Sequence, residues 1–206
     1  MKTDSFSKKR KRSALKVGKE STAVLVVDML NDFFKPRGKM VLDGGHVLFE
    51  PIRKLIRKAR SVKVPVIYVN DSHRPSLKKE DREFKKRAEH CIEGTWGAQV
   101  VDELKPQNGD VIITKRRFSG FFETDLDLTL KDLQVDTVIV MGVVTNICVR
   151  STIHDAFFRG YKVIVPRDCV MATGEREQES SLYDIETHFG DVTTSEKVIE
   201  MMMKTR

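Results

Sequence analysis

Short apolar runs recur along the chain and alternate with segments of helical periodicity. The runs are rich in β-branched residues, which predicts strands buried on both faces of a parallel sheet. They cover residues 23–28, 64–71, 110–115, 137–144 and 161–168, and residues 191–194 are expected to form a short edge strand.

Between these runs, apolar residues at helical spacing predict helices on the surface of the sheet. The clearest is 46–63, with Leu48, Ile52, Leu55, Ile56 and Ala59 on one face. Further helices are expected over residues 98–104, 125–133, 148–160, 178–189 and 195–203. The highly charged stretch 76–88 is interpreted as a surface helix or lid whose charges face solvent. Strands alternating with helices imply right-handed crossovers, so we expect an α/β fold, a three-layer α/β/α sandwich with a mainly parallel, doubly wound sheet.

Length and composition favour one folded unit with a basic extension. A chain of 206 residues suits a single domain, which we place at 20–206, after a flexible arm at 1–19. The arm carries the basic run 8–12 and contributes much of the formal net charge of +7. Because no aromatic residues are interleaved to stack bases, a solvated arm is favoured over a nucleic-acid site.

Two other classes of protein are disfavoured. No stretch has the length or hydropathy of a membrane span. Three cysteines and no signal-peptide pattern give no disulfide framework, so a cytoplasmic protein is expected.

Reactive side chains stand where several of the predicted strands end. Asp28, Asp71 and Lys115 each close an apolar run, and Cys148 follows the run 137–144 within a turn. The carboxyl ends of parallel strands share one edge of the sheet, where ligands bind in such folds. Four reactive groups at one edge predict an active site.

Cys148 is the predicted nucleophile at this edge. It falls in the first turn of a helix capped by Thr145 or Asn146, where the macrodipole favours thiolate over thiol. The competing interpretation is a small buried core residue. With Asp28 as base and Lys115 as the stabilising cation, the group predicts acyl transfer through a thioester. Backbone N–H groups around Val144 and Cys148 are the candidate oxyanion donors.

A second constellation consists of Asp71, His73 and His90. One carboxylate and two imidazoles suit a divalent metal such as zinc, iron or manganese. The alternative is a hydrogen-bonded Asp–His pair without a metal. No organic cofactor is expected.

Three motifs carry a resemblance to a known family. They are residues 26–33 (Val-Val-Asp-Met-Leu-Asn-Asp-Phe), Lys115 with 118–122 (Phe-Ser-Gly-Phe-Phe), and 142–149 (Gly-Val-Val-Thr-Asn-Ile-Cys-Val). From about 21 to 189 the chain resembles the isochorismatase-like cysteine hydrolases, which include nicotinamidases, isochorismatases, N-carbamoylsarcosine amidases and ureidoacrylate amidases. The resemblance implies that Asp28 is the general base, Lys115 its partner and Cys148 the nucleophile. It also implies a cis peptide between Val143 and Val144, and a homodimer or homotetramer.

Within that family two subgroups compete. Asp71-Ser-His73 and the stretch 90–98 are similar to the metal motif of nicotinamidases, which implies a metal that holds the pyridine nitrogen. However, Ser72 stands where nicotinamidases usually have tryptophan, and 117–122 and 145–149 look closer to ureidoacrylate and carbamoyl amidases.

Three functional hypotheses follow, the first a nicotinamidase that converts nicotinamide to nicotinate and ammonia. The second is a metal-independent ureidoacrylate or N-carbamoyl amidase, or an isochorismatase-type hydrolase. The third is a non-catalytic binding protein that uses the basic arm. A small carboxamide or ureido substrate is expected in a pocket lined by Phe33, Trp96, Phe118 and Phe122, although each of these aromatic residues fits the core as well.

Overall fold

The computed structural model describes residues 17–204. The predicted arm lies outside the described residues except for 17–19, where Val17 is buried against the core. No helix within 17–204 combines the length and apolar character needed to cross a membrane.

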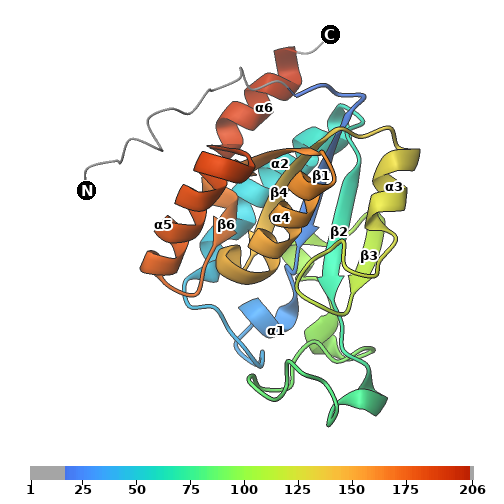
Figure 1. The fold of residues 1–206 in the computed structure, drawn as a ribbon, viewed down its shortest axis with the longest axis vertical. Helices are drawn as coiled ribbons and strands as arrows, with labels where there is room; N and C mark the ends of the chain where they lie inside the picture. The colour runs from blue at the N-terminus through green and yellow to red at the C-terminus, as the bar shows by residue number, and fades with distance from the viewer. Residues whose placement is uncertain (1–16, 205–206) are drawn as a thin grey trace.

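The centre of the molecule is a parallel sheet. Its main path runs β3 (Val111–Lys115), β2 (Val66–Asp71), β1 (Thr22–Val27), β4 (Thr137–Val143), β5 (Lys162–Pro166) and β7 (Asp191–Thr193), and the short β6 (Val170–Met171) pairs with β4. Each of these pairings is parallel. The carboxyl ends of β1 and β2 point toward the end of the molecule that holds α1 (Asn31–Phe34) and the loops around 72–98 (Figure 1).

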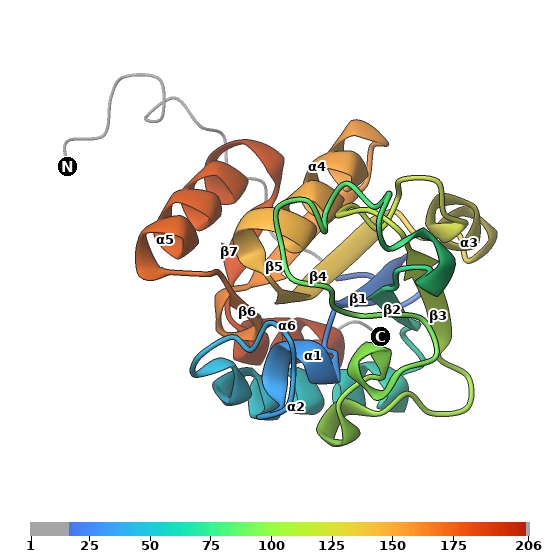
Figure 2. The same cartoon turned by 90° about the horizontal axis from the view of Figure 1, so that it is seen from below.

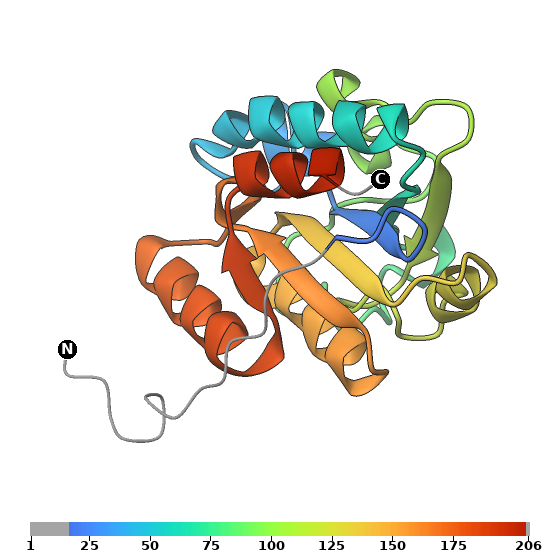
Figure 3. The ribbon, with the colours of Figure 1, turned by 90° about the horizontal axis from the view of Figure 1, so that it is seen from above.

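Helices cover both faces of the sheet, so the predicted three-layer sandwich is confirmed. One layer contains α2 (Phe49–Ser61) and α6 (Ser195–Lys204), which lie side by side (Figure 3). The other contains α3 (Leu126–Asp132), α4 (Arg150–Phe158) and α5 (Glu175–Asp184) (Figure 2).

Alternating residues of each strand supply the two halves of the core. In β1, Val24 and Val26 pack toward α2, whereas Leu25 and Val27 pack with the layer of α4. The predicted apolar face of the long helix is also confirmed, because Ile52, Leu55, Ile56 and Ala59 of α2 are buried. A strand buried on both faces explains why the sequence shows continuous apolar runs instead of alternation.

Several predicted elements differ in detail. Residues 76–88 are not a helix: after the single turn η3 (Pro75–Leu77) the chain continues in turns. The expected helix 98–104 is two separate turns, η4 (Trp96–Ala98) and η5 (Asp102–Leu104). The long helix begins with a 3₁₀ turn, η2 (Gly45–Leu48), and a further turn, η7 (Arg167–Cys169), precedes the unpredicted β6. The helix expected over 178–189 starts earlier, as α5, and ends in a π-type turn, η8 (Ile185–Phe189).

Candidate active site

Asp28 directly follows β1 and is held in place by the neighbouring strand. Its backbone has φ 53°, in the left-handed region, and its N–H donates to the carbonyl of Val69 at 3.1 Å. Aspartate is among the few residues that tolerate this conformation. The side chain is buried, and its Oδ1 accepts the backbone N–H of Asp71 at 2.7 Å. The carboxylate is therefore fixed from both its backbone and its side chain.

Lys115 is the side chain that joins the site together. It ends β3 in register with Asp71 of β2 and is fully buried. Its Nζ lies 2.9 Å from Asp28 Oδ2 and 3.4 Å from Asp71 Oδ1, and it donates to Cys148 Sγ at 3.6 Å. Burial alone would lower the pKa of Lys115, but the two carboxylates outweigh burial and hold it well above its ordinary value. The residue is thus an ammonium shared by two acids and one thiol.

Cys148 lies in a π-type helical turn, η6 (Thr145–Val149), between β4 and α4. The expected side-chain cap is not formed: the turn starts at Thr145, and extended Val144 precedes it. The peptide bond between Val143 and Val144 is cis, as the resemblance implied. Cys148 is partly exposed, whereas Cys91 and Cys169 are buried. Within residues 17–204 it is therefore the least enclosed cysteine, and its sulfur faces the buried ammonium of Lys115.

The charges of the site favour a neutral thiol beside an ionised acid. Burial raises the pKa of Cys148 well above its ordinary value; Lys115 opposes this shift, and Asp28 and Asp71 add to it. Burial therefore opposes the predicted shift toward thiolate. Burial also raises the pKa of Asp28, to about 6, against the opposing pull of Lys115. Because Lys115 Nζ contacts both the Asp28 carboxylate and the Cys148 sulfur, the carboxylate is positioned to take the thiol proton.

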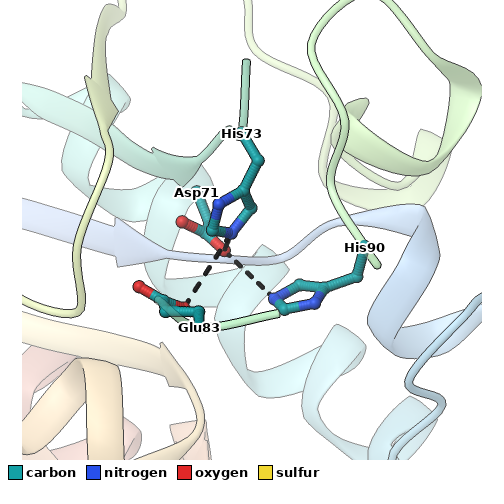
Figure 4. Close-up of side chains that lie close together, drawn as sticks. All are labelled: Asp71, His73, Glu83 and His90. Atoms are coloured by element: carbon teal, nitrogen blue, oxygen red, sulfur yellow. Dashed lines mark hydrogen bonds and ion pairs between the residues drawn. The ribbon is translucent and has the colours of Figure 1, made fainter. Parts of the chain in front are cut away.

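Beyond Lys115, four buried side chains converge on one point (Figure 4): Asp71, His73, Glu83 and His90. Their candidate ligand atoms all lie within 4.8 Å of one another. Asp71 Oδ2 is 3.2 Å from His73 Nε2 and 3.5 Å from His90 Nε2, and His73 Nε2 is 3.9 Å from Glu83 Oε2. The predicted trio is brought together, and Glu83 is a fourth member that the sequence did not reveal.

The donor set of this cluster fits a divalent metal. The Nδ1 atom of His73 contacts Asp81 and that of His90 contacts the carbonyl of Ala88, so both Nε2 atoms are directed into the cluster. Glu83 Oε1 is buried without a hydrogen-bond partner. Two imidazole nitrogens and two carboxylates match zinc, iron or manganese. The Asp71–His73 contact predicted as the metal-free alternative is also present, and it raises the pKa of His73, against the effect of burial, to about 9.

The four aromatic residues predicted to line a pocket do not stack on one another within residues 17–204. Phe33 packs against His90, with ring centroids 5.6 Å apart. Trp96, Phe118 and Phe122 are 39%, 42% and 49% exposed. Among residues 17–204, no ring contact joins these three to Phe33. Instead, Phe84 from the charged stretch packs on His73 at 4.4 Å.

Comparison with known proteins identifies the family. An Isochorismatase domain model matches residues 22–197. The ureidoacrylate amidohydrolase RutB of Serratia proteamaculans is 32% identical over 203 residues, covering 87% of this chain and 82% of the relative.

Solved structures agree with this assignment. A cysteine hydrolase from Pseudomonas syringae pv. phaseolicola 1448A matches with a TM-score of 0.86 at 32% identity, covering 95% of this chain and 98% of that one. N-carbamoylsarcosine amidase from Thermoplasma acidophilum matches with a TM-score of 0.77 at 35% identity, covering 85% of this chain and 96% of that one. The pyrazinamidase/nicotinamidase of Streptococcus mutans UA159 matches with a TM-score of 0.79 at 26% identity, covering 84% of this chain and 100% of that one. The chain therefore belongs to the isochorismatase family of hydrolases.

Proposed function

We propose that this protein is a cysteine amidohydrolase that cleaves a C–N bond of a small ureido or carbamoyl compound. One observation carries the chemistry: the Lys115 ammonium contacts both Asp28 and Cys148 at the carboxyl edge of the sheet. The substrate class is supported by the relatives, which include ureidoacrylate amidohydrolases and an N-carbamoylsarcosine amidase. These relatives favour a ureidoacrylate or N-carbamoyl amidase over a nicotinamidase. Family membership favours a hydrolase over a non-catalytic binding protein.

In the proposed reaction Asp28 accepts the thiol proton as Cys148 Sγ attacks the carbonyl carbon. Lys115 offsets the negative charge that passes between the carboxylate and the sulfur. The backbone N–H groups of Val144 and Cys148 stabilise the developing oxyanion. The tetrahedral species collapses as the leaving nitrogen takes the proton from Asp28, which leaves an acyl group on sulfur. Asp28 then deprotonates a water molecule that attacks this acyl or carbamoyl group, and it returns that proton to the departing sulfur, which restores the thiol. A carbamoyl group leaves as a carbamate, which breaks down to ammonia and carbon dioxide.

A second candidate is the carboxamide of a pyridine-type ring, as in nicotinamide. The observation that favours it is the cluster of Asp71, His73, Glu83 and His90, which contacts the catalytic group through Lys115. When bound there, a divalent ion would supply a Lewis acid able to hold a ring nitrogen or polarise a carbonyl. These four residues are the proposed ligands.

The test is an ammonia-release screen with the full chain. Substrates are ureidoacrylate, N-carbamoyl amino acids, nicotinamide and pyrazinamide, each assayed after chelation and again with added Zn²⁺ or Mn²⁺. We expect turnover of a ureido or carbamoyl compound, and nicotinamide turnover dependent on metal would favour the second candidate. Cys148→Ala should abolish release, while Cys169→Ala, which removes a buried thiol that is not among the proposed catalytic residues, should retain it. Undiminished release by Cys148→Ala would exclude the mechanism.

The predicted assembly has a separate test. A homodimer or homotetramer should appear in light scattering of the full chain, and a monomer at assay concentrations would contradict it.

A further inference from the structure

Asp81 lies outside the four-residue cluster but contacts two of its members. It sits in the turns that follow η3, and its side chain is 11% exposed. Its Oδ2 is 2.8 Å from His73 Nδ1, and its Oδ1 accepts the backbone N–H of Glu83 at 3.0 Å. One carboxylate therefore links an imidazole to the chain segment that supplies the fourth side chain.

The first contact determines which nitrogen of His73 faces the cluster. An Nδ1–H that donates to Asp81 leaves Nε2 as the nitrogen that faces Asp71 and Glu83, and Nε2 can bind a cation when the cation displaces its proton. Carboxylates that hold the outer N–H of a metal-binding histidine fix its tautomer and ring orientation, and they raise its basicity as a ligand.

The second contact determines where Glu83 points. Asp81 and Glu83 form a turn in which the side chain of the first residue accepts the N–H of the residue two positions later. The charged neighbours Arg82, Lys85 and Lys86 stay exposed or partly exposed, while Glu83 is buried. Because this stretch has no helix or strand to orient its side chains, the Asp81 contact to the Glu83 N–H helps to fix the backbone from which Glu83 reaches the cluster. The N–H groups of Lys86 and Arg87, which donate to the Glu83 carbonyl at 2.9 Å, hold the other side of that residue.

We propose that Asp81 is a positioning residue that aligns His73 and Glu83 together for binding a divalent cation. This proposal rests on the proposed metal site. The Asp81 carboxylate would orient two of the four ligands of that site, His73 and Glu83. Asp81 belongs to neither the catalytic group nor the ligand set, so its role is measured in cation affinity.

The test compares the full-length wild type with Asp81→Ala, Asp81→Asn and Glu80→Ala. Each protein is stripped with a chelator and titrated with Zn²⁺ in competition with a chromophoric chelator, and Co²⁺ absorption spectra report the ligand geometry. Asp81→Ala should weaken Zn²⁺ binding about 10- to 100-fold, the range typical of such outer carboxylates. The Zn²⁺ affinity of Asp81→Asn should lie between those of the wild type and Asp81→Ala, since one amide oxygen replaces two accepting carboxylate oxygens. Glu80→Ala, which removes an exposed acid one residue away, should bind as the wild type does.

Circular dichroism and thermal unfolding of the metal-free proteins separate alignment from folding. Should Asp81→Ala lose its structure, Asp81→Asn, which keeps the shape of the side chain, decides the question. Wild-type Zn²⁺ affinity and Co²⁺ spectra in a folded Asp81→Ala, or in Asp81→Asn when the alanine variant unfolds, would overturn the proposal. A wild-type protein that binds neither ion would overturn it too, while ammonia release by that protein would leave the amidohydrolase proposal standing.

Discussion

Replacing Lys115 with methionine would leave two buried carboxylates without their ammonium. The side chain of Lys115 is fully buried, and it contacts both Asp28 and Asp71. Methionine has nearly the same length and no charge, so Lys115→Met keeps most of the packing and removes the ion pairs. We expect a large loss in the free energy of unfolding.

The size of this loss can be worked from the distances. At an effective dielectric constant of about 20, the attraction is about 6 kcal/mol to Asp28 at 2.9 Å and about 5 kcal/mol to Asp71 at 3.4 Å. Removing the lysine from water costs several kcal/mol, which offsets much of that attraction. Breaking a buried pair by removing one partner typically costs about 3–5 kcal/mol, and we expect a value in this range.

Urea unfolding followed by far-UV circular dichroism measures the effect. The matched control is Lys162→Met, because Lys162 lies 3.0 Å from Asp136 but the two side chains are 72% and 52% exposed. The control should lose less than about 1 kcal/mol. Adding Asp28→Asn to Lys115→Met should restore part of the stability, since it removes one unpaired charge. Equal losses in Lys115→Met and Lys162→Met would refute the reasoning that burial makes this ammonium important.

Three further predictions concern catalysis, the backbone and the metal. Because burial raises the pKa of Asp28 to about 6, its ionised, proton-accepting form is lost as the pH falls below that value. Below pH 6, kcat/KM should therefore drop about tenfold per pH unit. A value of kcat/KM that stays level down to about pH 4, near the pKa of an unperturbed aspartate, would contradict this. In calorimetry, Gly142→Ala should lower the melting temperature far more than Gly109→Ala. Both glycines have positive φ, but only at Gly142 would a Cβ overlap the backbone of Val27. Similar decreases in melting temperature for the two variants would count against this packing argument. His90→Ala should lose stoichiometric Zn²⁺ in metal analysis while exposed His46→Ala retains it, and retention by both would remove His90 from the ligand set.

The proximity of Asp28, Lys115 and Cys148 was predictable because each of them follows a continuous apolar run. Asp28 and Lys115 mark the ends of two strands, and Cys148 follows a third, so parallel pairing alone brings them to one edge. The charge state of Cys148 was not predictable in the same way. Its pKa depends on how deeply the fold buries the sulfur and on the two acids that lie beside it.

Glu83 and Asp81 show where sequence patterns stop being informative. They stand in a stretch of alternating charges in which Glu80 and Glu89 are exposed, and no spacing distinguishes the buried acids from the exposed ones. The stretch forms turns, so neither helical nor strand periodicity applies to it. What distinguishes them is their contacts in the fold, with His73 for both acids and between Asp81 and the Glu83 backbone, and no sequence pattern announces these contacts.

The pairing of β2 with β3 places Asp71 directly opposite Lys115, and Asp28 receives its hydrogen bond from the same rung of the ladder. The spacing of the reactive groups is thus set by strand register, which insertions or deletions in the connecting loops leave unchanged. Changes in the loops 72–98 and 116–125 would therefore alter access to the site and its histidines without moving Asp28, Asp71 or Lys115 along their strands. In a fold of this kind, changes in the loops can alter which substrates reach the site while the reactive side chains keep their positions.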